Sequence, residues 1–569
     1  MLREVWTYIA HKWESWQVEL HGTYSVERLY NLKRYSHCTS HARALFVMFI
    51  TPLPCLISVI LVDMIPLEAP AKGLKYSHMF WFRAFQFTLV INITVMEQSV
   101  GSTAILFGLS HVVGYPLPFT ICLGSPGCCI ILVTMSAYLW GKRVRESPEI
   151  QSDLVNYVLV VVAQLTLIYI YPVYNYIFMG LSAVPQSAFT LLLPLMKIIA
   201  KNYLAHLFRN MEDLKPEMVI LNVEVFHALF VAVCTQRSTS INTTILLIFM
   251  DFVHACMGLH DTDMMLSSLN ELLQQTRANI RSRSKSSSRS AITIRLMSSL
   301  PSMSSISANL VGKDLDLLDV TMFLLSIDEQ LRANLALRSR SHTASLRQRS
   351  VAPEQQQIPP SSVQQNSLVG MTPNAEEDQN RPPPVAAAPA NRYSTSSPTA
   401  NVILKSAAAQ AVAVHLSDAD EQMLRSMSSG NRALFVHQTL QLLHFTEFML
   451  LVEFTEVIIP AIYCVYLGVI SHLPNRQFYA GLRDLDDASM WRNISNVMVY
   501  ATLEIVSFIL LSALLYRKVR ISPLNQLAFV LATQWQLVQS KLIIWVVFTV
   551  QTSLDHFGVD YSFKFAWLH

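Results

Sequence analysis

Long apolar stretches, separated by short polar ones, make up most of the chain. A helix that crosses a membrane needs about 20 mostly apolar residues to span a hydrocarbon core of about 30 Å. Stretches of this kind lie at 44–65, 79–98, 101–123, 126–141, 154–178, 181–207, 219–234, 240–259, 445–471, 492–516 and 524–551. The pattern predicts an all-α polytopic integral membrane bundle of about 11 passes, within a range of roughly 9 to 11.

The segment 101–141 is open to two interpretations. The sequence GYPLPFTICLGSPGCC interrupts its apolar pattern, so the segment forms either two passes or one pass and a re-entrant stretch. Basic residues gather within 1–43 and again at 142–145, and basic clusters beside membrane helices face the cytoplasm. An even number of passes between the two clusters satisfies this rule. It favours two passes in 101–141 and a cytoplasmic N-terminus.

A polar insert interrupts the apolar pattern between about 275 and 430. Tracts rich in Ser and Arg at 281–290 and 338–350 are accompanied by a Pro-, Gln- and Ala-rich stretch, a composition that buries too little apolar surface to offset ordering. Two pieces, 315–337 and about 402–427, look helical, and the first is expected to dock on the membrane helices or on a partner. The insert is therefore predicted to be cytoplasmic and largely disordered.

These patterns divide the chain into five parts. A cytoplasmic or interfacial amphipathic segment precedes a first membrane block of about eight passes, and then come the insert, a second block of about three passes and a C-terminal tail. The parts cover 1–43, 44–260, 261–432, 433–554 and 555–569. KRVRESP at 142–148 resembles RKVRISP at 517–523, which indicates either a duplication or a common way to begin a helix after a basic cluster.

Composition agrees with a membrane protein and narrows the chemistry. The chain is 52% apolar and 14% charged, which lies outside the usual soluble range. A net charge of +3 gives no support for nucleic-acid binding, and the eight cysteines lack the spacing of a zinc site or a disulfide framework. The common motifs of soluble enzymes are missing from the sequence. We therefore predict neither a nucleic-acid partner nor a cofactor, and find no support for an enzyme.

Ionisable side chains inside apolar windows are the candidates for function, because each costs about 2.5 to 3.5 kcal/mol to insert and so faces a partner helix or a wet cavity. Several place an acid and a histidine three residues apart on one helix face, where they can bind a metal or relay a proton. The predicted ion or proton pathway consists of Glu224, His227, Asp251, His254, Glu447, Glu453, Glu456 and Glu504. The alternative is that these groups are local pairs that only stabilise helix packing.

Serines in the Arg-rich tracts are candidates for regulation. The predicted phosphorylation sites are Ser284, Ser286, Ser290 and Ser350. Phosphorylation there would turn a cationic tract into one of mixed charge and weaken its attraction to the anionic inner leaflet. A solvated linker without a switch is the alternative interpretation.

Several phrases in the two membrane blocks carry a resemblance to a known group of proteins. They are VDMIPL from residue 62, PLPF from 116, LVEFTEVIIPAIY from 451, LPN from 473, QLAFV from 526 and HFGVD from 556. In these phrases the chain resembles the uncharacterised multi-pass transmembrane proteins abundant in oomycetes. The resemblance implies membrane residence and a shared helical body, and it implies no particular chemistry.

The residues favour a transporter or channel-like protein for a cation, a proton-coupled solute or a small molecule. The alternative is a membrane receptor or scaffold that acts through its phosphorylatable cytoplasmic insert. The expected partners are the lipid bilayer, a small cation or solute, and cytoplasmic proteins that bind the insert. The membrane is either the plasma membrane or an internal one. Acids that converge in three dimensions would favour transport, and acids scattered in local pairs would favour the scaffold.

Overall fold

The computed structural model describes residues 17–91, 96–182, 185, 189, 192–208, 212–237, 241–286, 316–328, 416–479, 481–560, 565 and 567. Regular structure within these ranges is helical, apart from an isolated β-bridge between Tyr479 and Leu554. The described residues belong to one compact unit. Most of the predicted insert lies outside these ranges, so the structure does not test the prediction that it is disordered.

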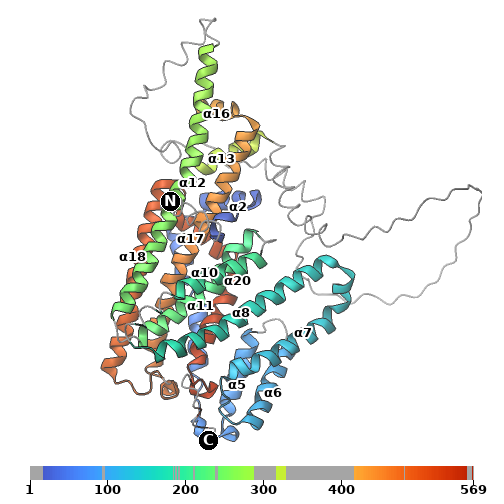
Figure 1. The fold of residues 1–569 in the computed structure, drawn as a ribbon, viewed down its shortest axis with the longest axis vertical. Coiled ribbons are helices and arrows are strands. Elements are labelled where there is room, and N and C mark those ends of the chain that lie inside the picture. Colours follow the sequence, from blue (N-terminus) through green and yellow to red (C-terminus); the bar gives the residue numbers. More distant parts are fainter. Residues whose placement is uncertain are drawn as a thin grey trace, which may run out of the picture. The chain divides into compact units, whose positions relative to one another are not determined.

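The helices come from both sides of the insert and from within it (Figure 1). Before the insert lie α2 (Val26–Cys38), α3 (His41–Ile50), α4 (Leu53–Asp63), α5 (His78–Ile91), α6 (Met96–Val113), α7 (Thr120–Glu146), α8 (Pro148–Gly180), α10 (Leu192–Leu207), α11 (Lys215–Arg237) and α12 (Ile241–Ser286). After it lie α17 (Ser429–Ile470), α18 (Asp487–Val519), α19 (Pro523–Thr533) and α20 (Trp535–Thr552). Two short helices belong to the predicted insert, α13 (Leu317–Ile327) and α16 (Asp418–Arg425).

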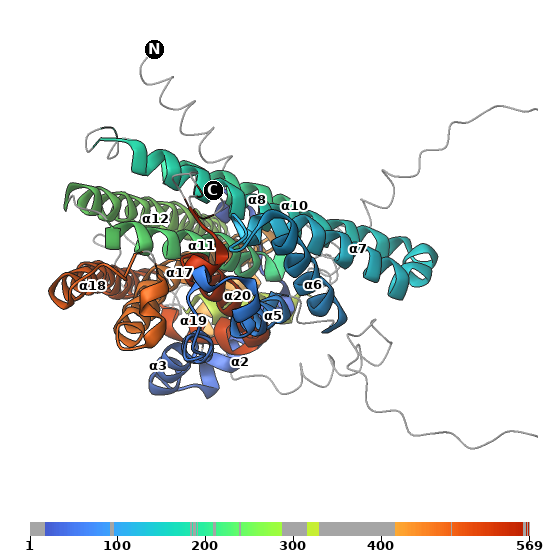
Figure 2. The same cartoon turned by 90° about the horizontal axis from the view of Figure 1, so that it is seen from below.

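Helix α17 is the central element of this arrangement. It packs against α11, α12 and α18, as both views show, and also contacts α4, α13 and α19 (Figures 1 and 2). Its Leu443, Phe448, Leu451 and Ile459 side chains are fully buried. A helix that is apolar on nearly every side belongs in the core of a bundle, so the sequence of α17 accounts for its position.

Several helices have the length and apolarity of membrane spans. Among the described residues, four qualify: His41–Asp63, Thr120–Leu139, Ser429–Ile470 and Asp487–Val519. A fifth candidate is the pair α19 and α20, which meet at an angle of 81° and together form either a broken span or a re-entrant loop. The protein is thus all-helical in its described part, with several helices long enough to cross a membrane.

Helix boundaries differ from the apolar windows in several places. The window 101–123 contains a break, because α6 ends at Val113 and α7 begins at Thr120. Prolines 116 and 118 explain the break, since proline lacks an N–H and disfavours helical geometry in the residue before it. Of the window 181–207, the structure describes the helix α10, Leu192–Leu207.

Another difference is α12, which continues from the window 240–259 to Ser286 and therefore enters the predicted insert. Leu266, Leu269 and Leu273 are buried and follow one another at spacings of three and four residues. This spacing keeps one apolar face of α12 against its neighbours α16 and α17, so the helix does not end at the apolar window.

The helix predicted at 315–337 is present as α13, and it docks on α17, α16 and α2. Leu317, Leu324 and Leu325 are completely buried there. Of the second predicted helix, at about 402–427, the structure describes α16, and residues 402–415 lie outside the described ranges.

The two KRVR-like motifs begin helices of different shape. Pro148 starts the continuous helix α8, which has 33 residues, whereas Pro523 starts α19, which ends after 11 residues at the 81° bend. Both prolines occupy the first helical turn, where a missing N–H costs nothing. The shared helix start explains the likeness of the two motifs, and the duplication stays a prediction.

Candidate functional site

Three carboxyl groups gather between α17 and α18. Glu453 and Glu456 lie three residues apart on α17 and so share a face, and Glu504 faces them from α18. One oxygen of each group lies within 4.8 Å of the others, and all three side chains are buried. We call these residues the carboxylate triad. Like charges this close in a buried site cannot all persist without protons or a cation between them.

Two lysines of α10 link the triad to α11. The Lys197 Nζ lies 2.8 Å from Glu456 Oε1 and 2.9 Å from Glu224 Oε2. The Lys201 Nζ lies 2.5 Å from Glu224 Oε1 and 3.3 Å from Glu19 Oε1, in the 3₁₀ turn η1 (Val18–His21). A chain of ion pairs therefore runs from the N-terminal segment to the triad.

Neutral donors face the remaining carboxyls. The Ser507 hydroxyl donates to Glu453 Oε2 over 3.1 Å, and the Tyr500 hydroxyl donates to Asp251 Oδ2 over 3.3 Å. Among the ion pairs of the described residues, none involves Asp251, Glu453 or Glu504. Carboxyls with hydroxyl donors and no cationic partner suit a site that exchanges protons or a small cation.

A cavity of about 30 Å³ borders this region between α12, α17 and the N-terminal segment. Glu19, His254, Asp261 and Glu453 are among its lining residues. A water needs about 10 to 15 Å³ on this measure, so the cavity has room for about two waters. It reaches Glu453, a member of the triad, from the side on which Glu19 lies.

The structure thus brings together most of the predicted pathway. Glu224, Asp251, Glu453, Glu456 and Glu504 belong to this region, and His254 lines the cavity beside it. His227 is buried on α11 one turn from Glu224, but the ion-pair partners of Glu224 are the two lysines. The site is therefore organised by ion pairs between acids and lysines on different helices, and not by the acid–histidine pairs within one helix that the sequence predicted.

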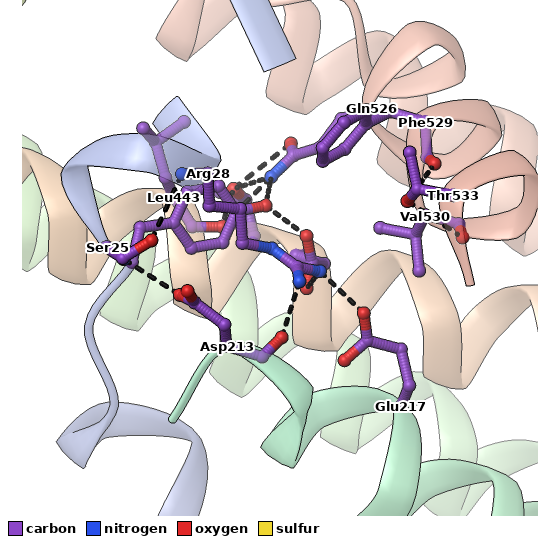
Figure 3. Close-up of polar contacts among 12 residues, drawn as sticks. Ser25, Arg28, Asp213, Glu217, Leu443, Gln526, Phe529, Val530 and Thr533 are labelled. Atoms are coloured by element: carbon purple, nitrogen blue, oxygen red, sulfur yellow. Dashed lines mark hydrogen bonds and ion pairs between the residues drawn. The ribbon is translucent and has the colours of Figure 1, made fainter. Parts of the chain in front are cut away.

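Glu447 lies in a different cluster, centred on Arg28. Figure 3 shows Arg28 of this cluster with Asp213 and Glu217 beside it. The Arg28 Nη2 lies 2.5 Å from Glu217 Oε1 and 2.7 Å from Glu447 Oε1, and the Tyr24 hydroxyl donates to Glu447. Arg28 Nη1 also donates to the Asp213 carbonyl. These contacts fasten the N-terminal segment to α11 and α17. In the sequence, Arg28 is one of several basic residues within 1–43. No sequence pattern links it to Glu217 and Glu447, which are 189 and 419 positions away.

A third buried cluster lies at the ends of α4 and α5. Asp63 forms an ion pair with Arg83 and accepts hydrogen bonds from the hydroxyls of Tyr466, at 2.7 Å, and Tyr479, at 2.6 Å. Arg83 Nε donates to Gln551 Oε1 over 2.7 Å. The cluster joins five separate helices or loops and is fully enclosed, so its role is to hold them together.

Four of the six phrases that carry the resemblance, those from residues 62, 116, 473 and 556, meet near this third cluster. Asn475 Nδ2 donates to the Asp63 carbonyl at 2.7 Å, and the His556 ring bonds to the Glu68 carbonyl at 2.7 Å. The Phe119 N–H donates to the Gly558 carbonyl at 2.9 Å. Gly558 adopts a φ of 60°, and a Cβ there would overlap the Leu117 carbonyl, so only glycine fits. These four phrases therefore build one packing centre, whereas the phrase from 451 carries Glu453 and Glu456 of the triad and the phrase from 526 contacts Tyr24 beside Arg28.

Two of the predicted phosphorylation sites, Ser284 and Ser286, lie in the last turns of α12. Ser290 and Ser350 lie outside the described residues. A scan against protein-family models and searches of curated proteins and of solved structures found no match to the chain.

Proposed function

We propose that this chain is a transporter or channel-like membrane protein that moves a small cation or protons through the carboxylate triad. The observation that carries the proposal is the convergence of Glu453, Glu456 and Glu504 within 4.8 Å in the buried centre of the bundle. Placing three acids there costs free energy, and protons or a cation that neutralise them offset that cost. The ion-pair chain from Glu19 and the adjoining cavity supply a route of approach.

The proposal includes the finer topology predicted from the sequence. About 11 passes, a cytoplasmic N-terminus and a cytoplasmic insert agree with the positive-inside rule, and we keep the resemblance to the oomycete membrane proteins as part of the same hypothesis. The candidate spans of the described chain and its additional apolar helices are the elements from which these passes would be built.

Flux through the reconstituted protein tests the function. Proteoliposomes are loaded with pH- and cation-sensitive dyes and exposed to gradients of H⁺, Na⁺, K⁺, Mg²⁺ and Ca²⁺. We expect flux of at least one of these ions, reduced about tenfold or more in Glu453→Gln and Glu504→Gln, because an amide accepts neither a proton nor a cation as a carboxylate does. Glu271→Gln, which removes an exposed acid of α12, should leave flux unchanged. Wild-type flux no greater than that of empty vesicles for every ion would contradict the proposal.

The receptor or scaffold alternative is favoured by one observation, the docking of α13 on α17. This contact ties the insert to the helix that carries Glu453 and Glu456. If the insert is the functional part, variants of the triad should leave partner binding intact and no ion should cross the membrane. Capture of a cytoplasmic protein by the insert, with no flux in the vesicle assay, would favour this alternative.

A further inference from the structure

Lys197 occupies a distinctive place beside the carboxylate triad. Its ammonium group is shared almost equally between Glu456, at 2.8 Å, and Glu224, at 2.9 Å. Its side chain is only 8% exposed. Among the ion pairs of the described residues, no other ammonium contacts a member of the triad.

The two partners of Lys197 differ in how else they are neutralised. The Lys201 ammonium also contacts Glu224, at 2.5 Å, so Glu224 keeps a cationic partner wherever Lys197 moves. Glu456 has no second lysine among its described ion pairs. The contact of Lys197 with Glu456 is thus the one that decides whether the triad carries a neutralising positive charge.

We propose that Lys197 is a tethered competitor for the cation that enters the triad. Its ammonium neutralises Glu456 when no cation is bound, and it shifts fully onto Glu224 when a cation arrives. The flexible four-carbon stem of lysine allows such a shift, and repulsion between two positive charges at low dielectric drives it. This inference rests on the proposed function.

Competition between the Lys197 ammonium and the cation would help an ion pathway to release its ion. A cation bound by three buried carboxylates without opposition would leave slowly, and conduction requires a site weak enough to release its ion. The ammonium weakens the site by offering Glu456 an alternative partner. The same internal charge replaces the cation as it leaves, so the triad is never without compensation.

Lys197 and Lys201 provide a matched pair of variants. Both Lys197→Met and Lys201→Met remove one of the two ammonium groups on Glu224, and only the first also frees the triad. The measurement is thermal stabilisation of the purified full chain during titration with the ion that the vesicle assay identifies. In Lys197→Met we expect half-maximal stabilisation at an ion concentration about tenfold lower than in the wild type. Lys201→Met should stay within about twofold of the wild type.

Two further variants extend the test if Lys197→Met does not fold. Glu224→Gln leaves Lys197 with Glu456 as its only carboxylate partner, so the competition increases and the required ion concentration rises about tenfold. Lys197→Arg keeps the positive charge and should retain the weak binding of the wild type.

The outcomes separate this inference from the proposed function. Equal ion affinities in Lys197→Met and Lys201→Met, or an unchanged affinity in Glu224→Gln, would overturn the role of Lys197 while ion binding itself stands. A wild-type protein that neither transports nor is stabilised by any of the ions would instead contradict the proposed function.

Discussion

His556 sits in an aromatic cage just after α20. Its ring stacks on Phe80 with centroids 5.4 Å apart, meets the edge of Phe478 at 5.1 Å, and bonds to the Glu68 carbonyl. Burial lowers the pKa of His556 to about 4, whereas the unfolded chain has the ordinary value of about 6.5. The folded protein therefore holds this histidine neutral.

The stability that His556 contributes is complete above about pH 6.5 and is lost as the pH falls toward 4. At pH 5 the loss reaches roughly 2 kcal/mol. We expect the unfolding midpoint in detergent to fall between pH 7 and pH 5, and to fall less in His556→Asn, whose side chain does not titrate. His37→Asn, at an exposed site, should follow the wild-type profile. Identical profiles for wild type and His556→Asn would contradict this assignment.

At the same scale, the sequence identified the acids of the triad but missed two members of the other buried clusters, Arg28 and Asp63. Glu453, Glu456 and Glu504 stood out because carboxyls are costly inside apolar windows. Arg28 lies well before the first apolar window and Asp63 lies near the end of it, where charge is common, so nothing local marks them as buried. Glu447 of the Arg28 cluster and Tyr479 of the Asp63 cluster lie hundreds of residues from them along the chain, and tertiary pairing of that kind is not encoded in any spacing.

At the scale of elements, apolar periodicity located the helices and left their ends and bends undetermined. The extension of α12 depends on leucines that continue one face after the apolar window ends. The 81° bend between α19 and α20 lies at Gln534, and neither a proline nor a glycine is next to it. We therefore attribute the bend to tertiary packing. The docking of α13 was predictable because its apolar face cannot remain in water.

Helix α13 yields a prediction about the insert. Leu324 is fully buried, Phe323 lies 5.2 Å from the Arg425 guanidinium, and Asp319 and Asp328 form ion pairs with Lys33 and Arg432. Leu324→Asp places an unpaired charge in that contact, which costs several kcal/mol and should release α13.

Limited chymotrypsin digestion detects the release of α13. Cleavage at Phe323, followed by mass spectrometry, should appear early in Leu324→Asp and late in the wild type. Ser326→Asp introduces the same charge at an exposed position of the same helix and should digest like the wild type. Early cleavage in all three proteins would mean that α13 does not dock in solution.

At the scale of the whole molecule, contacts gather at two ends of the bundle. At one end, the loop after α4 bonds to Asn475, the turn before α7 bonds to Gly558, and Arg483 pairs with Asp555 at 2.9 Å. The predicted topology places these segments outside the cytoplasm, apart from the turn before α7, which lies in the outer half of the predicted pass 101–123. Segments that the positive-inside rule assigns to the external side of the membrane thus contact one another.

The opposite end joins the segments that the same topology places inside. The Ser25 N–H donates to Asp213 over 2.8 Å, Asn525 reaches Ser36 at 3.4 Å, and Lys33 pairs with Asp319 of the insert. The turn between α10 and α11, the turn between α18 and α19, the N-terminal segment and α13 are therefore neighbours. A chain with an odd number of passes between any two of them would separate these contacts by the thickness of a membrane.

Protease sites inserted singly at the two ends test this arrangement. A site after Pro360 lies in the insert, and a site after Asp484 lies in the exposed loop between α17 and α18. In intact cells we expect cleavage after Asp484 and protection after Pro360, because the bilayer shields the cytoplasmic side. Permeabilised cells should show both cleavages, which controls for accessibility. Cleavage after Pro360 in intact cells would place the insert, α13 and the Arg28 cluster outside, since their mutual contacts require a common side, and the entire topology would then be inverted.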